Sequence, residues 1–148
     1  MDDEGRRRRW MSALATAGPA ELERAWERFP DQPLYTVLRA PEVGLLLVRA
    51  RAGGTGLRFN LGELPVARCS VRLPDGTVGH AYVGGRSLRH AELAAVFDAL
   101  LQHRETGPVL EASLVDSLVA SRDARRRAAA SASEPTRVEF FTLVRGEE

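Results

Sequence analysis

The stretch "LPVARCSVRLPDGTVGHAYVGG", residues 64–85, constrains the fold more than any other part of the chain. Ala67, Cys69, Val71 and Leu73 alternate with polar residues in it, and a period of two is that of a half-buried strand. "PDGT" then supplies a turn before a second β-rich run, which predicts an antiparallel hairpin. One face of this hairpin is apolar, and the other is polar and basic.

Further β-rich segments lie before this hairpin. "LYTVLRA" and "GLLLVRAR" are separated by "PEVG", and because proline and glycine together are typical of a turn, we predict two antiparallel strands joined there. The segment that follows the glycine-rich stretch at 51–63 also has the composition of a strand. We therefore predict a mostly antiparallel sheet of about four to six strands.

Helical periodicity marks the remaining segments. Apolar residues recur at helical spacing on either side of Gly18, with Pro19 opening the second run, so we predict an N-terminal helical pair. Ser87 is a candidate N-cap for a helix through "LRHAELAAVFDALLQH", whose apolar stripe should pack on the sheet. "VLEASLV" fits a strand or a helix, and we predict a break near Asp116 and then a helix from about Ala120 that Pro135 ends. The predicted fold class is α+β, with helices packed on one side of the sheet.

At 148 residues the chain fits one domain. We divide it into a helical N-terminal arm (1–30), a core of sheet and helix (34–103), and a C-terminal helix with an apolar tail for partner docking (109–148). An apolar end has to be covered by the chain's own core or by a partner. The candidate partner-interface residues are Trp10, Met11, Leu14, Phe140, Phe141 and Leu143.

The charge balance gives no global field that would attract a polyanion. There are 21 basic and 20 acidic residues, for a net charge of +1, and every basic residue is arginine. A nucleic-acid interface would have to use "RRRR" at 6–9 or "RRR" at 125–127, but neither run is interleaved with aromatic residues. We expect these runs to be solvated or to face a partner, and we expect no nucleic-acid binding.

No apolar run approaches the roughly 18 residues of a membrane span, and the start of the chain lacks the pattern of a signal peptide. The single Cys69 fits a reducing compartment. We therefore expect a cytoplasmic protein without membrane contact.

The glycine-rich stretch "RAGGTGLRFNLGE", residues 51–63, excludes two phosphate-binding motifs. A P-loop needs a lysine and the chain has none; a dinucleotide fingerprint fails because Phe59 occupies its third glycine position and a strand follows. Two interpretations stay open: backbone N–H groups that bind an anion between Arg51 and Arg58, or a strand connection that needs positive φ angles. The candidate anion contacts here are Arg51, Gly53, Gly54 and Gly56.

A second set of candidates lies around the predicted hairpin. Arg68 and Arg72 share a strand face, and Arg86 precedes a helix N-terminus, which favours anions. These arginines could clamp a triphosphate or form salt bridges across an interface. His90, in the first turn of that helix, is either a general base or a satisfied residue at the edge of the core.

Common catalytic and metal-binding patterns are missing from the sequence. With one cysteine and no H-x-x-H or C-x-x-C spacing, the chain offers no metal site that it could complete alone. No G-x-S-x-G motif or Ser–His–Asp set is evident either.

Several collinear stretches resemble one family. They are "RRRWMSALA", "RAGGTGLRFNLGE", "VARCSVRLPDGTVGHAYVGGR", "HAELAAVFDAL" and "RVEFFTLVRGE". Together they are similar to the G subunits (PhnG) of the bacterial carbon–phosphorus lyase core complex, over nearly the whole chain. Ser87 and Leu88 depart from the aspartate and polar pair expected after Gly85 and Arg86, which puts a ligand role for position 87 in doubt.

The resemblance implies an accessory subunit of a hetero-oligomer with H, I and J subunits. With the H, I and L proteins, the family takes part in transferring the ribose triphosphate moiety of MgATP to methylphosphonate, giving α-D-ribose 1-methylphosphonate 5-triphosphate and adenine. The resemblance carries over no catalytic residue and no cofactor held by this chain alone. The isolated chain is therefore expected to be inactive. The alternative is a free-standing, arginine-rich module that binds nucleic acid or regulates.

Overall fold

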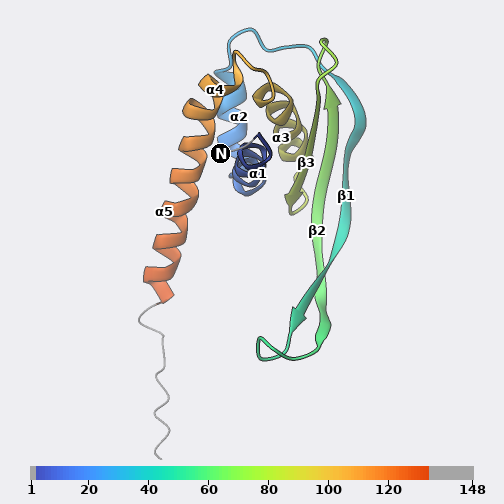
Figure 1. The fold of residues 1–148 in the computed structure, drawn as a ribbon, viewed down its shortest axis with the longest axis vertical. Helices are drawn as coiled ribbons and strands as arrows, with labels where there is room; N and C mark the ends of the chain where they lie inside the picture. Colours follow the sequence, from blue (N-terminus) through green and yellow to red (C-terminus); the bar gives the residue numbers. More distant parts are fainter. Residues whose placement is uncertain (1–2, 134–148) are drawn as a thin grey trace, which may run out of the picture.

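A computed structural model describes residues 3–133 and arranges them as a layer of helices against one face of an antiparallel sheet (Figure 1). The predicted α+β class is confirmed. In chain order the elements are α1 (Asp3–Thr16), α2 (Pro19–Glu27), β1 (Thr36–Arg51), β2 (Arg58–Arg72), β3 (Val78–Gly84), α3 (Leu88–Leu101), α4 (Gly107–Leu110), the π-helix η1 (Glu111–Val115) and α5 (Asp116–Ser133).

The sheet within residues 3–133 has three strands in the order β1-β2-β3, so the prediction of four to six was wrong. The proline and glycine of "PEVG" lie inside one 16-residue strand, β1, instead of forming a turn. Pro41 is tolerated there because β1 is an edge strand, where a missing N–H costs no hydrogen bond on the open side. Register shifts between Val37 and Arg39 and between Arg39 and Glu42 absorb the local irregularity. Likewise, β2 runs without a break from 58 to 72.

Helix α3 covers the apolar face of β2 and β3, as the sequence predicts. Ala67, Cys69 and Val71 of β2 are buried at 1% exposure or less. Gly79 of β3 lets the helix approach closely, because a Cβ at this position would lie 2.0 Å from the carbonyl oxygen of Ala95. Any side chain at position 79 would therefore push α3 off the sheet.

Helices α1 and α2 form on either side of Gly18 as predicted, and both pack into the main hydrophobic cluster. Trp10, Leu14, Leu22 and Trp26 belong to the same buried cluster as the sheet and α3. The Trp26 ring meets Phe97 of α3 edge to face, with centroids 6.1 Å apart. The N-terminal pair is thus part of the core.

A buried carboxylate ties three elements together. Asp98 of α3 has no exposed surface, and its Oδ2 accepts hydrogen bonds from Nη2 of Arg7 at 2.8 Å and from the backbone N–H of His80 at 2.9 Å. Its Oδ1 accepts from Nε1 of Trp10 at 2.9 Å and from Nε of Arg7 at 3.3 Å. A single side chain therefore joins α1, α3 and β3.

The remaining arginines of the "RRRR" run are largely used inside the protein as well. Arg6 and Arg9 both bind the carboxylate of Glu111, and Arg9 also donates to Asp116. Only Arg8, with 75% of its side chain exposed, extends into solvent. The expectation of a solvated or partner-facing run was wrong for three of these four residues, because they pair with acidic residues about a hundred positions away.

The C-terminal part of the described chain is one helical rod. α4, η1 and α5 follow one another without a gap, so "VLEASLV" is helical and its interpretation as a strand was wrong. The prediction of a break near Asp116 and a helix from about Ala120 was wrong, because the π-helical segment that ends at Val115 leads directly into α5 at Asp116. The expected helix end at Pro135 lies outside the described residues.

None of the helices within residues 3–133 combines the length and apolarity that crossing a bilayer requires. The cytoplasmic location stays a prediction.

Replacing Asp98 by alanine should lower the free energy of unfolding by about 2–4 kcal/mol, because the indole N–H of Trp10 and the backbone N–H of His80 would lose their acceptor and the partly exposed Arg7 its counter-charge. Urea unfolding followed by circular dichroism measures this change. The matched control is Glu4→Gln, which breaks an exposed pair with Arg8 and should cost less than about 1 kcal/mol. Similar losses in the two variants would contradict the role given to Asp98.

The carboxylate of Glu21 accepts three hydrogen bonds, which make its contribution to stability depend on pH. Its Oε1 accepts from Ser121 at 2.6 Å, and its Oε2 accepts from the N–H of Gly18 at 2.6 Å and from Arg125 at 2.9 Å. Burial acts to raise the pKa of this carboxyl, but the three hydrogen bonds outweigh it and hold the pKa below the ordinary value of 4.5. The stability that these bonds contribute is therefore present above that value and is lost as the pH falls through the folded-state pKa.

Glu21→Gln should consequently lower the free energy of unfolding by about 1–2 kcal/mol at neutral pH. The difference in free energy of unfolding between the variant and the parent should become smaller below pH 4.5, where the parent carboxylate itself becomes protonated. Urea titrations at a series of pH values measure it. Glu27→Gln, an exposed change on the same helix, is the control. A difference that stayed constant with pH would rule out the ionised carboxylate as the cause.

Candidate functional site

The glycine-rich stretch forms the turn of the β1–β2 hairpin. Gly53 and Gly54 have φ angles of +56° and +80°, and a Cβ at either would meet no atom within 4 Å, so glycine is needed there for its conformation. The N–H of Gly56 donates to the carbonyl oxygen of Ala52 at 2.8 Å, and Nη1 of Arg51 donates to the carbonyl oxygen of Gly56 at 3.3 Å. The stretch therefore serves as a strand connection, and anion binding by its backbone stays a prediction.

The predicted arginine clamp is not brought together. Arg68 and Arg72 lie on the sheet face away from α3, and Arg68 donates to Glu42 at 2.8 Å. Hydrogen bonds with Tyr82 and Glu42 raise the pKa of Arg68 above its usual range. Arg72 pairs with Val78 at the start of β3, whereas Arg86 follows the end of that strand. The strand length alone puts these two arginines about 20 Å apart.

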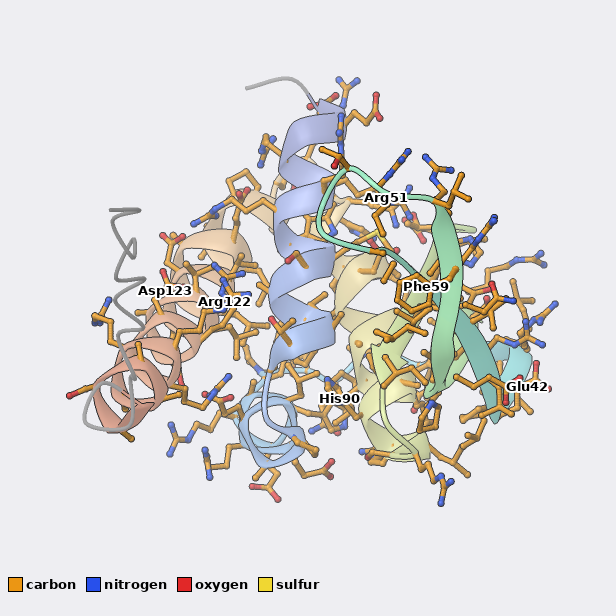
Figure 2. The ribbon with its side chains drawn as sticks, turned by 90° about the horizontal axis from the view of Figure 1, so that it is seen from below. Glu42, Arg51, Phe59, His90, Arg122 and Asp123 are labelled. Carbon is orange, nitrogen blue, oxygen red and sulfur yellow. The ribbon has the colours of Figure 1, made fainter. Side chains whose placement is uncertain are left out.

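His90 is a core residue with 4% exposure. Its Nε2 is 2.8 Å from the carbonyl oxygen of Leu14, and its backbone N–H donates to Oγ of Ser87, the N-cap of α3. Figure 2 shows His90 well apart from Arg51 at the hairpin turn. Of the two interpretations left open by the sequence, the geometry matches the satisfied residue at the edge of the core.

The predicted partner residues at the N-terminal end are mostly internal. Trp10 and Leu14 are 5% and 2% exposed, so they cover this chain's own core and offer no surface to a partner. Met11 is half-buried against the same core. The other three predicted residues, Phe140, Phe141 and Leu143, lie outside the described residues.

A different apolar surface, which the sequence analysis missed, lies on the hairpin. β3 pairs with β2 only from Val66 onward, so residues 45–65 form a two-stranded ribbon that projects past the helices (Figure 1). This segment is called the ribbon below. Seven of the 14 exposed large apolar side chains in the described part of the chain lie on it: Leu45, Leu46, Leu47, Leu57, Phe59, Leu61 and Leu64.

The strand register assigns these side chains to two faces, because paired residues project to the same side and neighbours along a strand alternate. The alternation on β2 is interrupted once, at Leu61, since Val48 pairs with Gly62 but Arg49 pairs with Asn60. Leu46 pairs with Leu64, and Ala50 pairs with Phe59, so one face is apolar along its length. Leu45 and Leu47 lie on the opposite face. The ribbon is therefore apolar on both sides near the body of the protein.

Toward its tip, the second face of the ribbon becomes basic. Arg49 and Arg51 continue the row of Leu45 and Leu47, and Arg58 pairs directly with Arg51. Figure 2 shows Arg51 beside the turn and Phe59 along the adjoining strand. Sequence spacing marked Arg51 and Arg58 as neighbours of the glycines, but only the register brings Arg49 onto the same face.

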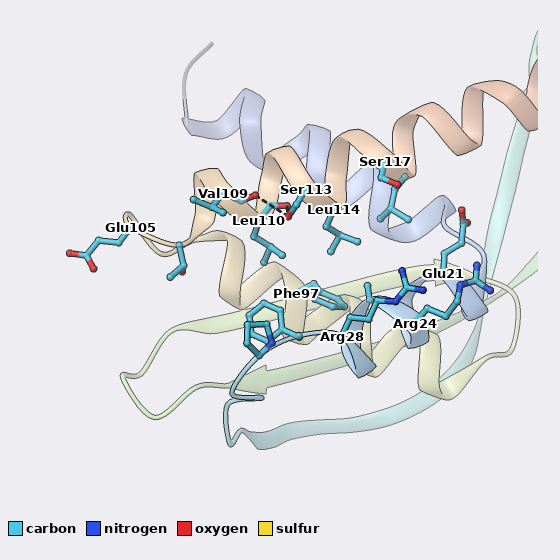
Figure 3. A pocket seen from close by; sticks show the side chains of 15 residues that line it. Glu21, Arg24, Arg28, Phe97, Glu105, Val109, Leu110, Ser113, Leu114 and Ser117 are labelled. Atoms are coloured by element: carbon cyan, nitrogen blue, oxygen red, sulfur yellow. Dashed lines mark hydrogen bonds between the residues drawn. The ribbon is translucent and has the colours of Figure 1, made fainter.

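An apolar pocket of about 670 Å³ lies between α2 and the helical rod (Figure 3). Phe97, Leu110 and Leu114 provide apolar lining, while Arg24 of α2 and Arg28, which directly follows α2, stand at its edge. The ribbon residues take no part in it.

Among residues 3–133, no group of three His, Cys, Asp or Glu side chains is arranged to hold a metal ion. Cys69 is buried, and burial raises the pKa of its thiol above the usual value. A buried thiol with a raised pKa is a poor nucleophile. The ribbon and the pocket are therefore the candidate surfaces for a partner or a ligand that we consider in the described part of the chain.

Comparisons with known proteins assign the chain to a family. The sequence model of the family described as "Phosphonate metabolism protein PhnG" matches residues 5–146. A protein of Rhizobium meliloti (strain 1021), named alpha-D-ribose 1-methylphosphonate 5-triphosphate synthase subunit PhnG, is 45% identical over 149 residues, which cover 99% of this chain and 95% of that protein. The matched range includes the helical layer and the ribbon together, so the similarity is not confined to one motif.

Proposed function

The chain belongs to the PhnG family of phosphonate metabolism proteins, and on that premise we propose that it is the G subunit of α-D-ribose 1-methylphosphonate 5-triphosphate synthase. In this role it is an accessory subunit of a transferase. The complex transfers the ribose triphosphate moiety of MgATP to methylphosphonate and releases adenine. This chain contributes to the assembly and does not carry out the reaction alone.

The ribbon is the observation that supports an assembly role. An isolated two-stranded hairpin is marginally stable in water, and exposed apolar patches of this kind mark protein interfaces. Leu46 and Leu64 form a cross-strand pair at 55% and 47% exposure, with no element of the described chain covering them. A larger subunit that closes over the ribbon would remove this surface from water.

The partners we propose are the H, I and J subunits of the carbon–phosphorus lyase core complex, with the L protein acting alongside them. MgATP is then a substrate of the complex, and this chain alone holds no cofactor. The subunit name of the Rhizobium meliloti relative supports a multi-subunit enzyme. The buried positions of Trp10 and Leu14 support docking through the ribbon instead of through the N-terminal stripe.

The alternative of a free-standing nucleic-acid or regulatory module finds no support. Arg6, Arg7 and Arg9 of the most basic run are engaged by acidic side chains of this chain. The phosphate contacts of a nucleic-acid site need free cationic groups. The family membership points in the same direction.

Changing Leu46 and Leu64 together to serine should weaken association with the H and I subunits about tenfold or more, because both side chains would leave a buried contact. Co-expression with a tagged H or I subunit, followed by quantitative pull-down, measures the effect. The free energy of unfolding of the isolated variant should change by less than about 1 kcal/mol, since neither residue is buried in it.

The control is Leu34→Ser, which removes an apolar side chain that is 84% exposed but lies outside the ribbon. It should co-purify as the parent does. If the ribbon variant assembles normally, the ribbon is not the docking surface. If the parent chain fails to co-purify with any of the proposed subunits, the proposed function is wrong.

A further inference from the structure

We propose that the tip of the ribbon contacts the triphosphate chain of the nucleotide substrate or of the ribose triphosphate product through Arg49, Arg51 and Arg58, called the tip arginines below. The proposal rests on the proposed function, because it needs a synthase in which such a triphosphate is bound.

The register brings the tip arginines together. Arg49 and Arg51 lie two residues apart on β1, so their Cα atoms are about 7 Å apart on the same face. Arg58 lies directly opposite Arg51, where paired Cβ atoms are about 5 Å apart. All three side chains are exposed. Three guanidinium groups can therefore converge on one ligand.

None of the tip arginines forms an ion pair with an acidic residue of the described part of the chain. Glu63 is the single acidic residue of the ribbon, against three arginines. It pairs with Leu47, so it lies on the same face as the tip arginines but nearer the body of the protein. Like charges directly opposite one another destabilise a strand pair, and Arg51 and Arg58 stand in that arrangement. A bound anion would relieve this repulsion.

Several other arginines of the chain, unlike the tip arginines, form ion pairs with acidic side chains. Arg7 binds the buried Asp98, Arg9 binds Glu111 and Asp116, and Arg68 binds Glu42. At the tip, by comparison, the recorded side-chain hydrogen bond runs from Arg51 to the carbonyl oxygen of Gly56 at 3.3 Å. That contact uses one of the five N–H donors of its guanidinium.

A triphosphate fits these groups. Guanidinium groups bind phosphate oxygens in two-point hydrogen bonds, and each phosphate of the chain offers several acceptors. The synthase named for the Rhizobium meliloti relative makes a 5-triphosphate, so its site has to neutralise several negative charges on one ligand. The number of free cationic groups at the tip matches that requirement.

The apolar part of the ribbon would position the tip arginines within the complex. Leu45 and Leu47 precede the tip arginines on the same face. If this part is buried against a partner subunit, the tip enters the assembly, where reduced contact with water strengthens each ion pair. Figure 1 shows the turn hooking toward the side of the sheet on which the helices lie.

The test uses the complete complex, purified through a tag on a partner subunit and carrying the triple variant Arg49→Gln, Arg51→Gln and Arg58→Gln. The probe is inorganic tripolyphosphate, with orthophosphate as a second arm, and isothermal titration measures binding to both. The control removes three other exposed arginines of this chain: Arg104→Gln, Arg126→Gln and Arg127→Gln.

We expect the triple variant to assemble normally and to bind tripolyphosphate at least about tenfold more weakly, with a shallower dependence on salt because fewer counterions are exchanged. The KM for MgATP should rise in parallel, and orthophosphate binding should change less. Arg51→Lys, which keeps the charge but loses the two-point geometry, should fall between the parent and Arg51→Gln. The control variant should bind tripolyphosphate within about twofold of the parent.

Two outcomes would overturn the proposal. Unchanged affinity for tripolyphosphate in an intact complex would show that the tip does not contact the ligand. Loss of assembly in the triple variant alone would show that the tip arginines pair with carboxylates of a partner protein instead. Failure of the parent chain to assemble is a different result, because it refutes the proposed function itself and this proposal with it.

Discussion

The buried carboxylate of Asp98 is the contact on which the rest of the arrangement depends. It sits on α3 with no exposed surface and is neutralised by the guanidinium of Arg7, while the indole of Trp10 and the N–H of His80 fill its remaining acceptor positions. Burying a carboxylate without such partners would be prohibitive. The N-terminal helix is therefore docked by charge as well as by apolar packing, and α1, α3 and β3 are fixed in one orientation.

That fixed body gives the ribbon a rigid base. In the ribbon, β1 and β2 lose both the third strand and the helices that bury one face of the sheet. Half of the exposed large apolar side chains in the described part of the chain therefore gather on its 21 residues. A contiguous exposed apolar surface of this kind marks an interaction site. An accessory subunit explains the combination well: a self-sufficient core that holds out an apolar hairpin with a basic tip.

The elements with strong local signals were predictable, and the others depended on distant partners. Helix α3 and the β2–β3 hairpin follow from periodicity, a serine cap and turn residues. The prediction of a turn at "PEVG" was wrong because an edge strand tolerates proline. Whether a strand lies at the edge depends on the whole sheet, which the local sequence does not show. The candidate site was found only in part, since Arg49 joins Arg51 and Arg58 through pairing register, which the sequence does not display.

By itself, the sequence determined the fold class, the helical face that covers the sheet and the family, because these depend on residue periodicity and on collinear motifs. Tertiary structure alone decided which charges are satisfied and which are free. Arg7 and Arg51 are the same residue type in similarly basic surroundings, yet one is neutralised by a buried carboxylate and the other stands opposite a like charge at an exposed tip. The reason is physical: an ion pair is set by distance in space, and the carboxylate that pairs with Arg7 lies 91 positions along the chain.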